Sequence, residues 1–314
     1  MIKSYLSYIK RGFKLIIGQD YYHQTQEMGK VFYPKELKGY FNDLTGKTNW
    51  IGEVDIDGIS INILIDGRKI YFITTILQKA LGHYDKWLLT KNEKDYSEFI
   101  KLSKWVVEKQ DNEGGWEIGN FLGKGNISKY SAMVQGEAIS LLVRAWLSTN
   151  NGVFKSAAEK ALYLLIKSVE NGGVCYFQND YIFFEEVPTF PRNTILNGWI
   201  FALIGLYDYY LAFNDLKVID LLTQTLFTLK RHLPDYDTNY WSYYDIRKHL
   251  SSPFYHSLHI AQLKALNMIK PDIIFTYYID KWSDYQKKFL NRWRALSIKI
   301  YQKLREPGEV IIIK

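Results

Sequence analysis

The sequence is poor in cysteine and proline. Its 314 residues contain one cysteine, Cys175, and seven prolines. A single cysteine excludes an intramolecular disulfide, and with six scattered histidines it also excludes a zinc module built from Cys and His ligands. The fold must therefore depend on its apolar core, for which the 47% of hydrophobic residues are sufficient.

The sequence also lacks a segment typical of export or membrane insertion. Residues 1–20 interleave apolar residues with four basic ones, so they contain no apolar run like that of a signal peptide. Residues 194–213 form one long apolar stretch, but Asn193, Asn197 and Asp208 flank or interrupt it. We predict a buried helix there, and a cytoplasmic protein with no stable membrane insertion.

Signature motifs of common enzyme classes are missing as well, namely G-x-S-x-G, G-x-x-x-x-G-K-[ST], H-E-x-x-H and G-x-G-x-x-G. His256 and His259 are three residues apart, but no third ligand is apparent nearby, so we predict no metal site. Residues 110–116 match the Q-x-x-x-G-x-W repeat of terpene-cyclase barrels only once, and no Asp-x-Asp-Asp run follows. A glycine-containing turn with a packed tryptophan is the simpler interpretation.

Aromatic residues and positive charge are in excess. The chain contains 25 Tyr, 17 Phe and 9 Trp, and its 40 Lys and Arg against 33 Asp and Glu give a net charge of +7. A basic chain favours anionic partners, which leaves nucleic acid, an acidic polysaccharide and a membrane surface open.

The apolar pattern changes near residue 75. Two Asp-Gly pairs, at 57–58 and 66–67, flank a β-branched run at 59–65 and predict a β-hairpin in an N-terminal region, residues 1–75. From residue 73, apolar residues recur at three- and four-residue spacing, which predicts eight helices. Their expected ranges are 73–90, 95–110, 130–148, 154–169, 194–213, 215–232, 253–268 and 272–305.

Polar turns follow the second, fourth and sixth of these helices, at 110–116, 171–176 and 235–241. Short aromatic, strand-like pieces come next, such as 174–184 and 240–244. Repeated helical hairpins whose loops gather at one end predict an α/α toroid, in which inner helices form a barrel and loops line its mouth. We therefore predict a mainly α protein, with a catalytic α/α barrel of about four hairpins at 76–314. An irregular helical bundle is the alternative.

Residues 183–191 combine phenylalanines with two adjacent carboxylates, Glu185 and Glu186, and a Pro-x-x-Pro turn. Because burial raises the pKa of a carboxyl group, these residues are candidates for a general acid or base. A surface pair that caps the following helix is an equally good interpretation.

Residues 240–262 bring tyrosines and cations together. An ordinary tyrosine, with a pKa near ~10, is a poor base at neutral pH. Nearby cations such as Arg247, Lys248 and His256 would stabilise its phenolate, and Arg247 could also bind a substrate carboxylate. An aromatic core with a stacked arginine is the alternative.

A positive cleft lined with tyrosines suits a polysaccharide that carries carboxylates, because aromatic faces stack on sugar rings and Arg or Lys binds the acid groups. In such a sugar the carboxylate acidifies the hydrogen on C5. Neutralising the carboxylate lets a base remove that proton and form an enolate-like intermediate. Reprotonation from the opposite face is epimerisation, whereas expulsion of the 4-linked sugar is a lyase reaction.

Five ordered blocks within about residues 75–290 resemble the C-terminal domain of D-glucuronyl C5-epimerases. They are Gly114-Gly-Trp116, the segment from Tyr130 to Ala145, Glu185-Glu186-x-Pro-Thr189, the segment from Leu196 to Asp208, and Tyr244-Asp-Ile-Arg247 followed by Tyr255-His256-x-x-His259-Ile-x-Gln262. The resemblance implies an α/α-barrel enzyme that inverts glucuronic acid to iduronic acid within a polysaccharide, without a cofactor, and that forms a homodimer.

The resemblance also implies roles for individual residues. Glu186 and Tyr255 would be the acid–base pair on opposite faces of C5, Arg247 would neutralise the carboxylate and Tyr244 would assist. Candidate substrate-binding residues are Trp116, Gln135, Asn197, His256, His259 and Tyr84.

Two departures from the family pattern matter. Val187 stands where the animal enzymes carry another tyrosine, so that tyrosine is dispensable or another residue replaces it. No membrane anchor is apparent either, which favours a prokaryotic protein acting on a capsular or exported glycan over a Golgi enzyme acting on heparosan.

Three other functions compete with the epimerase. A uronate lyase shares the tyrosine and arginine chemistry, and a non-catalytic glycan-binding protein is motivated by Val187. A nucleic-acid binder rests on charge alone, and much of that charge lies on the last predicted helix, where large apolar residues alternate with Lys and Arg. That helix could instead seal a dimer.

Overall fold

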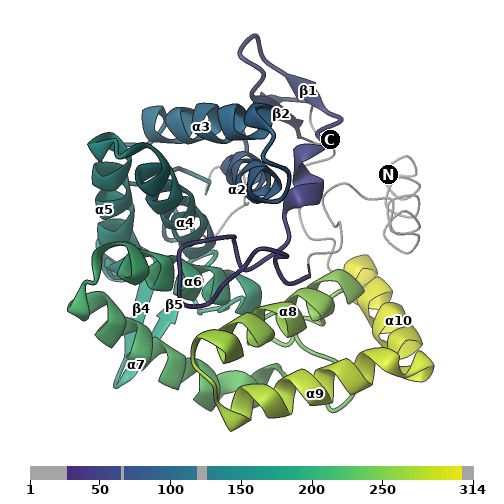
Figure 1. Cartoon of the computed structure of the whole chain (residues 1–314). Coiled ribbons are helices and arrows are strands. Elements are labelled where there is room, and N and C mark those ends of the chain that lie inside the picture. Colours follow the sequence, from purple (N-terminus) through teal and green to yellow (C-terminus); the bar gives the residue numbers. More distant parts are fainter. Residues whose placement is uncertain (1–26, 65–66, 119–125, 306–314) are drawn as a thin grey trace.

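The structure is a computed structural model that describes residues 27–64, 67–118 and 126–305. Four helical hairpins follow one another around a ring, with α2, α4, α6 and α8 on the inside and α3, α5, α7 and α9 on the outside (Figure 1). Their bounds are α2 Ile73–Thr90, α3 Glu93–Glu108, α4 Ala132–Thr149, α5 Gly152–Ile166, α6 Leu196–Phe213, α7 Leu216–His232, α8 Pro253–Ile269 and α9 Ile273–Lys287. The predicted α/α toroid of about four hairpins is confirmed.

The tight link between the two helices of a hairpin has a repeated design. In the first three hairpins the inner helix ends at a residue in the left-handed conformation, namely Lys91, Asn150 or Asn214. The next residue caps the outer helix, because the side chain of Asn92, Asn151 or Asp215 accepts a hydrogen bond from a backbone N–H of its first turn. Such caps stop one helix and start the next within two residues, which forces the antiparallel pairing.

The last predicted helix, 272–305, is in fact two helices. The chain turns at Lys288, which has an extended backbone, and α10 (Phe289–Arg305) leaves at an angle to α9. No proline or glycine marks this break. The turn lets the inner face of α10 reach the loop before α8, where Leu250 N donates to Gln302 Oε1 at 3.0 Å.

Strands occupy two places. The N-terminal hairpin prediction is confirmed and extended to a three-stranded antiparallel sheet of β1 (Glu53–Val54), β2 (Ser60–Ile63) and β3 (Lys69–Ile70); Asp66 lies outside the described residues. Between α5 and α6, β4 (Cys175–Gln178) pairs with β5 (Tyr181–Phe184), as the strand-like pattern at 174–184 predicts. Short 3₁₀ helices complete the elements, namely η1 (Thr45–Thr48), η3 (Val169–Asn171) and η4 (Leu233–Tyr236).

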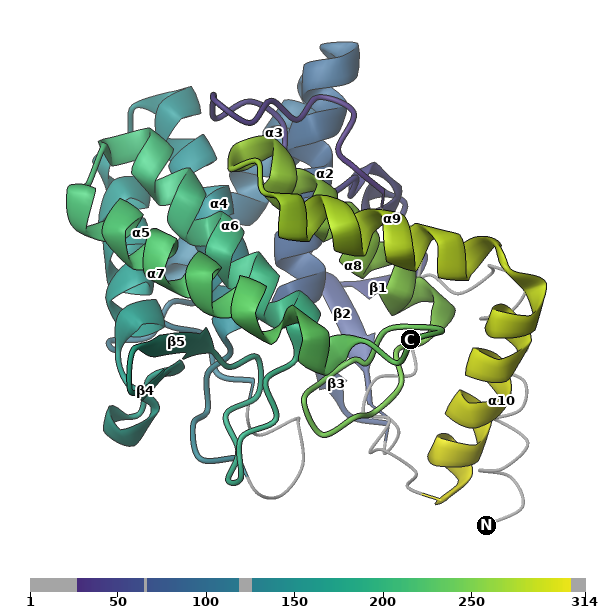
Figure 2. The same cartoon turned by 90° about the horizontal axis from the view of Figure 1, so that it is seen from below.

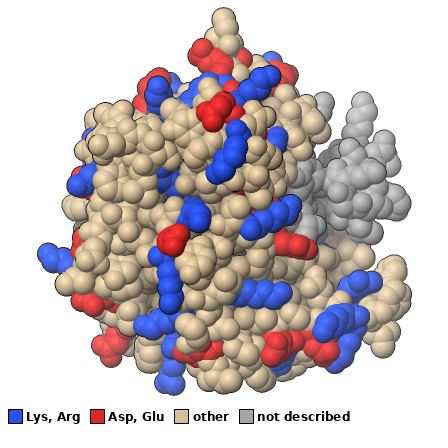
Figure 3. All heavy atoms as spheres, in the orientation of Figure 1, with Lys and Arg blue, Asp and Glu red and all other residues tan. Residues whose placement is uncertain are grey.

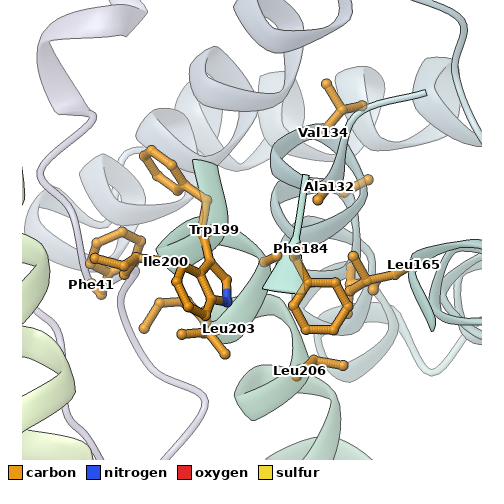
Figure 4. Packing of buried hydrophobic residues seen from close by; sticks show 14 of the residues in the cluster. Phe41, Ala132, Val134, Leu165, Phe184, Trp199, Ile200, Leu203 and Leu206 are labelled. Atoms are coloured by element: carbon orange, nitrogen blue, oxygen red, sulfur yellow. The ribbon is translucent and has the colours of Figure 1, made fainter. Parts of the chain in front are cut away.

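The core lies between the inner helices and extends to the residues before the barrel. Tyr40, Phe41, Leu44 and Ile59 are buried in the same cluster as the apolar side of α2. In Figure 4 the core is seen around α6, with side chains that converge from four other parts of the chain: Trp199, Ile200, Leu203 and Leu206 of α6, Phe184 of β5, Ala132 and Val134 of α4, Leu165 of α5, and Phe41. The apolar stretch at 194–213 is thus a buried helix. Among helices in the described ranges, none is both long and apolar enough to cross a membrane.

A buried ion pair ties the N-terminal segment to the barrel. Arg144 of α4 contacts Asp208 of α6, with 2.6 Å between Nη1 and Oδ2, and both side chains are almost fully buried. The guanidinium group also donates to the backbone carbonyls of Lys38 and Gly39. Because these bonds satisfy both charges, the pair can be buried without an uncompensated charge.

Candidate active site

The long connections gather at one end of the ring. The described parts of the loops that follow α3, α5 and α7 lie on the same side, at the bottom of Figure 2, where α4, α6 and α8 begin. Backbone hydrogen bonds join these loops: Ala132 N donates to Glu185 O, and Leu196 N donates to Tyr244 O, each at 3.0 Å. Residues far apart in sequence are therefore held together at this end of the barrel.

The two adjacent glutamates have different environments. Glu185 is buried and accepts hydrogen bonds from the backbone and the hydroxyl of Thr194, just before α6. Burial raises its pKa to about 7. Its carboxylate oxygens are occupied by the loop, so Glu185 fixes the entry to α6. Glu186, by contrast, contacts the first turn of α6.

The carboxyl group of Glu186 is enclosed although the residue as a whole is partly buried. Asn197 Nδ2, in the first turn of α6, donates to Glu186 Oε2 at 3.2 Å. A Cβ on Gly198 would lie only 2.2 Å from the same oxygen, so a glycine is required for the carboxyl group to pack against the helix. Desolvation raises the pKa of Glu186 to about 7, despite the opposing hydrogen bond from Asn197.

A third carboxyl group, Glu137 in the second turn of α4, is close enough to Glu186 to interact electrostatically with it. Glu137 is fully buried, and Gln78 Nε2 of α2 donates to its Oε1 at 2.9 Å. Its Oε2 has no hydrogen-bond partner among the described residues. Burial, with a smaller contribution from the charge of Glu186, raises its pKa to about 8, so Glu137 is mainly protonated at neutral pH.

Glu137 is not among the residues that the sequence predicts for the site. Its position lies inside the block from Tyr130 to Ala145, on a helix whose neighbouring residues are apolar or small. One signal could have identified Glu137: it is a carboxyl group on a helix that is buried over most of its length. An ionised group in such a place needs a partner or a proton.

Tyr244 and Tyr255, which the family resemblance names as site residues, lie next to each other. Their ring centroids are 4.8 Å apart, and a side-chain hydrogen bond joins them. Both residues are partly buried, which leaves each with some accessible surface. Tyr255 lies in the first turn of α8, whose N-cap is Ser252.

The expectation that nearby cations favour the Tyr244 phenolate is wrong. Burial, together with the charge of Glu186, raises the pKa of Tyr244 well above its ordinary value. His256 supplies no charge, because desolvation lowers its pKa to about 3. Tyr244 is therefore a proton donor at neutral pH.

Arg247 is exposed on the loop between Tyr244 and α8. Its Nη2 donates to Thr189 Oγ1 at 3.0 Å and to the carbonyl oxygen of Pro191. These bonds place the guanidinium group beside the 186–195 loop. Its contact with a substrate carboxylate stays a prediction.

All six predicted substrate-binding residues are buried, and the side chains of five of them interact only with protein groups outside the site. Trp116 Nε1 donates to Val106 O, and Gln135 Nε2 donates to the carbonyls of Gly114 and Ala161. Tyr84 packs against Phe99 and Trp87. Residues with less than a tenth of their surface exposed offer little area to a polymer, so we assign these three to the framework.

His256 and His259 belong to the framework as well. Both are fully buried, and the Nδ1 of each is hydrogen-bonded to the hydroxyl of Ser242. His256 also stacks on Trp241, with 3.8 Å between the ring centroids. In the part of the chain that the structure describes, no group of three or more His, Cys, Asp or Glu residues could hold a metal ion.

Asn197 is also buried, but it contacts the site directly through its bond to Glu186. Its backbone carbonyl accepts a hydrogen bond from Gln262 Nε2 of α8 at 3.0 Å. Glu186, Asn197, Tyr244 and Tyr255 thus form a cluster, here called the Glu186 cluster, at the start of α6 and α8. It combines a carboxyl group that ionises near neutral pH with tyrosines that can donate protons.

A family model and a named relative point to the same family. The family model described as "D-glucuronyl C5-epimerase C-terminus" matches residues 110–284, a segment that contains the whole Glu186 cluster. The D-glucuronyl C5-epimerase of Caenorhabditis elegans is 31% identical over 231 residues, covering 64% of this chain and 37% of that protein. The chain thus matches little more than a third of this relative's length. An uncharacterized protein of Methanocaldococcus jannaschii is 26% identical over 228 residues, covering 66% of this chain and 74% of that protein.

Solved structures show a more distant likeness. An unsaturated glucuronyl hydrolase from a Streptococcus has 13% sequence identity and a TM-score of 0.47, covering 69% of this chain and 63% of that one. A cellobiose 2-epimerase from Spirochaeta thermophila has 15% identity and a TM-score of 0.41, covering 67% and 53% respectively.

Proposed function

The chain belongs to the D-glucuronyl C5-epimerase family, since that family's model matches more than half of it, and on this premise we propose that it inverts C5 of D-glucuronic acid within a polysaccharide. The proposed product is L-iduronic acid. The name of the C. elegans relative supports glucuronate as the substrate sugar. Because the chain corresponds to 37% of that protein, the reaction is our proposal for this shorter protein.

The observation that carries the proposal is the Glu186 carboxyl group beside the paired tyrosines. With a pKa of about 7, a substantial fraction of Glu186 is ionised at neutral pH, and its ionised form is a stronger base than an ordinary carboxylate. We assign to Glu186 the removal of the proton from C5, and to Tyr255 the donation of a proton to the opposite face. Tyr244, held protonated by its surroundings, would orient Tyr255 through their hydrogen bond.

The intermediate carries extra negative charge on the substrate carboxylate, and a nearby cation would stabilise it. Arg247 is the candidate, because it is exposed on the same loop as Tyr244 and contacts the loop that follows Glu186. A guanidinium group can bind a carboxylate through two parallel hydrogen bonds.

Glu137, hydrogen-bonded to Gln78, influences the ionisation of Glu186. Because Glu137 is mainly protonated at neutral pH, it adds little charge that would oppose ionisation of Glu186. We therefore propose Glu137 as a positioning residue, which lets Glu186 ionise near pH 7 without touching the substrate.

The experiment is incubation of the full chain with a glucuronate polymer in deuterated water. Incorporation of deuterium at C5, followed by NMR, together with appearance of iduronate, supports epimerisation. An unsaturated product that absorbs near ~230 nm would identify a lyase, since elimination starts from the same proton removal. Binding without deuterium incorporation would instead support the non-catalytic glycan-binding function that Val187 raises. The exposed Glu170→Gln variant is a control that should behave as wild type.

A further inference from the structure

Helix α10 presents an apolar stripe to solvent. Five large apolar residues on it have about half or more of their surface exposed: Phe289 (62%), Leu290 (79%), Trp293 (54%), Ile300 (49%) and Tyr301 (61%). At 100° per residue, these positions lie within one third of the helix circumference. They therefore share one face of the helix, here called the α10 stripe, on which the exposed Ser297 lies between the first three residues and the last two.

The opposite face of α10 is fixed to the protein. Ala295 on this face is buried. Arg294, at the edge of the stripe, lies over the ring of Tyr240, 3.8 Å from its centroid. Lys299 Nζ donates to Leu250 O at 2.6 Å. Because these contacts fix the rotation of the helix, the α10 stripe must face outward.

The charges around the stripe are of one sign. Residues 289–305 contain no Asp or Glu. Exposed cations stand before the stripe and on both of its edges, namely Lys287, Arg292 and Arg305. The nearest acid before the helix, Asp284, forms an ion pair with Lys288 at 2.6 Å. Figure 3 shows blue side chains beside uncharged surface at the lower right, where α10 lies in Figure 1.

These features favour an anionic lipid surface over other occupants. Aromatic side chains on one face of a helix, flanked by Lys and Arg, are typical of helices that lie in the headgroup region of a membrane. A second copy that packed stripe against stripe would bring two uncompensated sets of cations together. A nucleic acid would use the cations but leave the apolar side chains exposed.

We propose that α10 docks the protein on an anionic membrane surface, with Phe289, Leu290 and Trp293 entering the headgroup region. The inner face of α10 braces the 240–250 loop, which carries Tyr244 and Arg247. Docking therefore holds this loop next to the membrane. If the proposed function is correct, the substrate is a uronate glycan attached to or presented at that membrane.

The test is co-sedimentation of the full chain with vesicles. Vesicles of phosphatidylcholine alone are compared with vesicles that contain phosphatidylglycerol. We expect binding to the anionic vesicles only, weakened by high salt because part of the attraction is electrostatic. Failure to bind the anionic vesicles overturns the proposal. Deuterium exchange on a soluble uronate polymer, measured separately, distinguishes this failure from failure of the proposed function.

Two variants locate the contact. Leu290→Ser combined with Trp293→Ser removes two exposed apolar side chains and should weaken vesicle binding by about tenfold or more, with unchanged circular dichroism. Ile273→Ser is a matched control, because Ile273 is 79% exposed on a different helix. Equal binding of the double variant and wild type contradicts the proposal. So does a dimer in light scattering that the double variant abolishes, since the stripe would then be a protein interface.

Discussion

The role given to Glu186 depends on the pH at which its carboxyl group ionises. Burial raises that pKa to about 7, and the base form is the ionised one. We therefore predict that kcat/KM for C5 exchange rises about tenfold per pH unit up to about pH 7 and then levels off. Tyr244, whose pKa is raised further, does not limit the rate below pH 9. A rate that is flat between pH 5 and 8 would exclude Glu186 as the base.

The two tyrosines should differ in their contributions. Tyr255→Phe removes the proposed proton donor and should lower the exchange rate by roughly 10²- to 10⁴-fold. Tyr244→Phe removes only the hydrogen bond that orients Tyr255, and we expect a loss of about tenfold. Tyr163→Phe, at a position that is 64% exposed, is the control. If Tyr244→Phe costs as much as Tyr255→Phe, Tyr244 takes part in the proton transfer itself.

At the residue level, the sequence predicted the members of the Glu186 cluster better than their surroundings. Glu186, Tyr244 and Tyr255 carry recognisable chemistry in recognisable blocks, and the structure brings them together. Residue type does not reveal burial, however. The sequence therefore also predicts substrate binding for Trp116 and His256, which are buried. The neutral state of His256 depends on Trp241, Ser242 and Trp282, which become its neighbours only after folding.

Helix packing explains how the site is brought together. Gly136 of α4 and Gly205 of α6 allow these helices to touch, because a Cβ on Gly136 would lie 2.5 Å from Phe201 O. A Cβ on Gly205 would lie 2.5 Å from the Cα of Gly136. Glu137 follows Gly136 directly, so the same close crossing brings Glu137 toward the start of α6.

Substitution of this glycine tests the crossing. Gly136→Ala should lower the free energy of unfolding by about 3 kcal/mol, because backbone atoms cannot move aside as a flexible side chain can. Gly152→Ala in α5 meets nothing within 4 Å and should be neutral or stabilising by up to ~1 kcal/mol. Denaturant titration of both variants gives the comparison. A neutral Gly136→Ala would show that the helices are not in contact there.

Most helix boundaries were predictable to within two or three residues, because apolar periodicity and the Asn or Asp caps are local signals. The break at Lys288 was not predictable in the same way. Its cause is tertiary, since α10 turns to meet Tyr240 and Leu250. The close crossing of α4 and α6 could not be inferred either, because a glycine in a helix does not identify the element it touches.

Across the whole molecule, buried carboxyl groups couple stability to pH. Burial raises the pKa of Asp85, Glu185 and Glu186 to about 7 and that of Glu137 to about 8. Between pH 6.5 and 8.5 the folded state therefore holds more protons than the unfolded state. Stability must fall as pH rises through this window. The buried histidines, whose pKa values are lowered, contribute to the pH dependence of stability only below about pH 6.5.

The Glu137→Gln variant isolates one part of this dependence. Glutamine cannot ionise, so this part of the pH dependence is lost in the variant. Between pH 6.5 and 8.5 its free energy of unfolding should rise relative to that of wild type by about 2 kcal/mol, at about 1.4 kcal/mol per pKa unit. Glu170→Gln, at an exposed position, should leave the pH dependence unchanged. Chemical unfolding at the two pH values measures both. A parallel shift of the Glu137→Gln and wild-type curves would mean that Glu137 is already ionised at pH 6.5.

The whole-molecule charge of +7 was a weak guide to function. On the face in Figure 3, blue and red side chains are interspersed with uncharged surface. Only the ordered blocks around the Glu186 cluster narrowed the choice of function. Homodimer formation stays a prediction.

The role of Glu186 as the base is tested most directly by the rate of deuterium incorporation at C5 of a glucuronate polymer, compared between wild type and Glu186→Gln. We expect exchange by wild type and a loss of at least about 100-fold in the variant, with the fold retained, because glutamine keeps the shape but cannot accept the proton. Equal exchange rates in the two proteins would show that Glu186 is not the base.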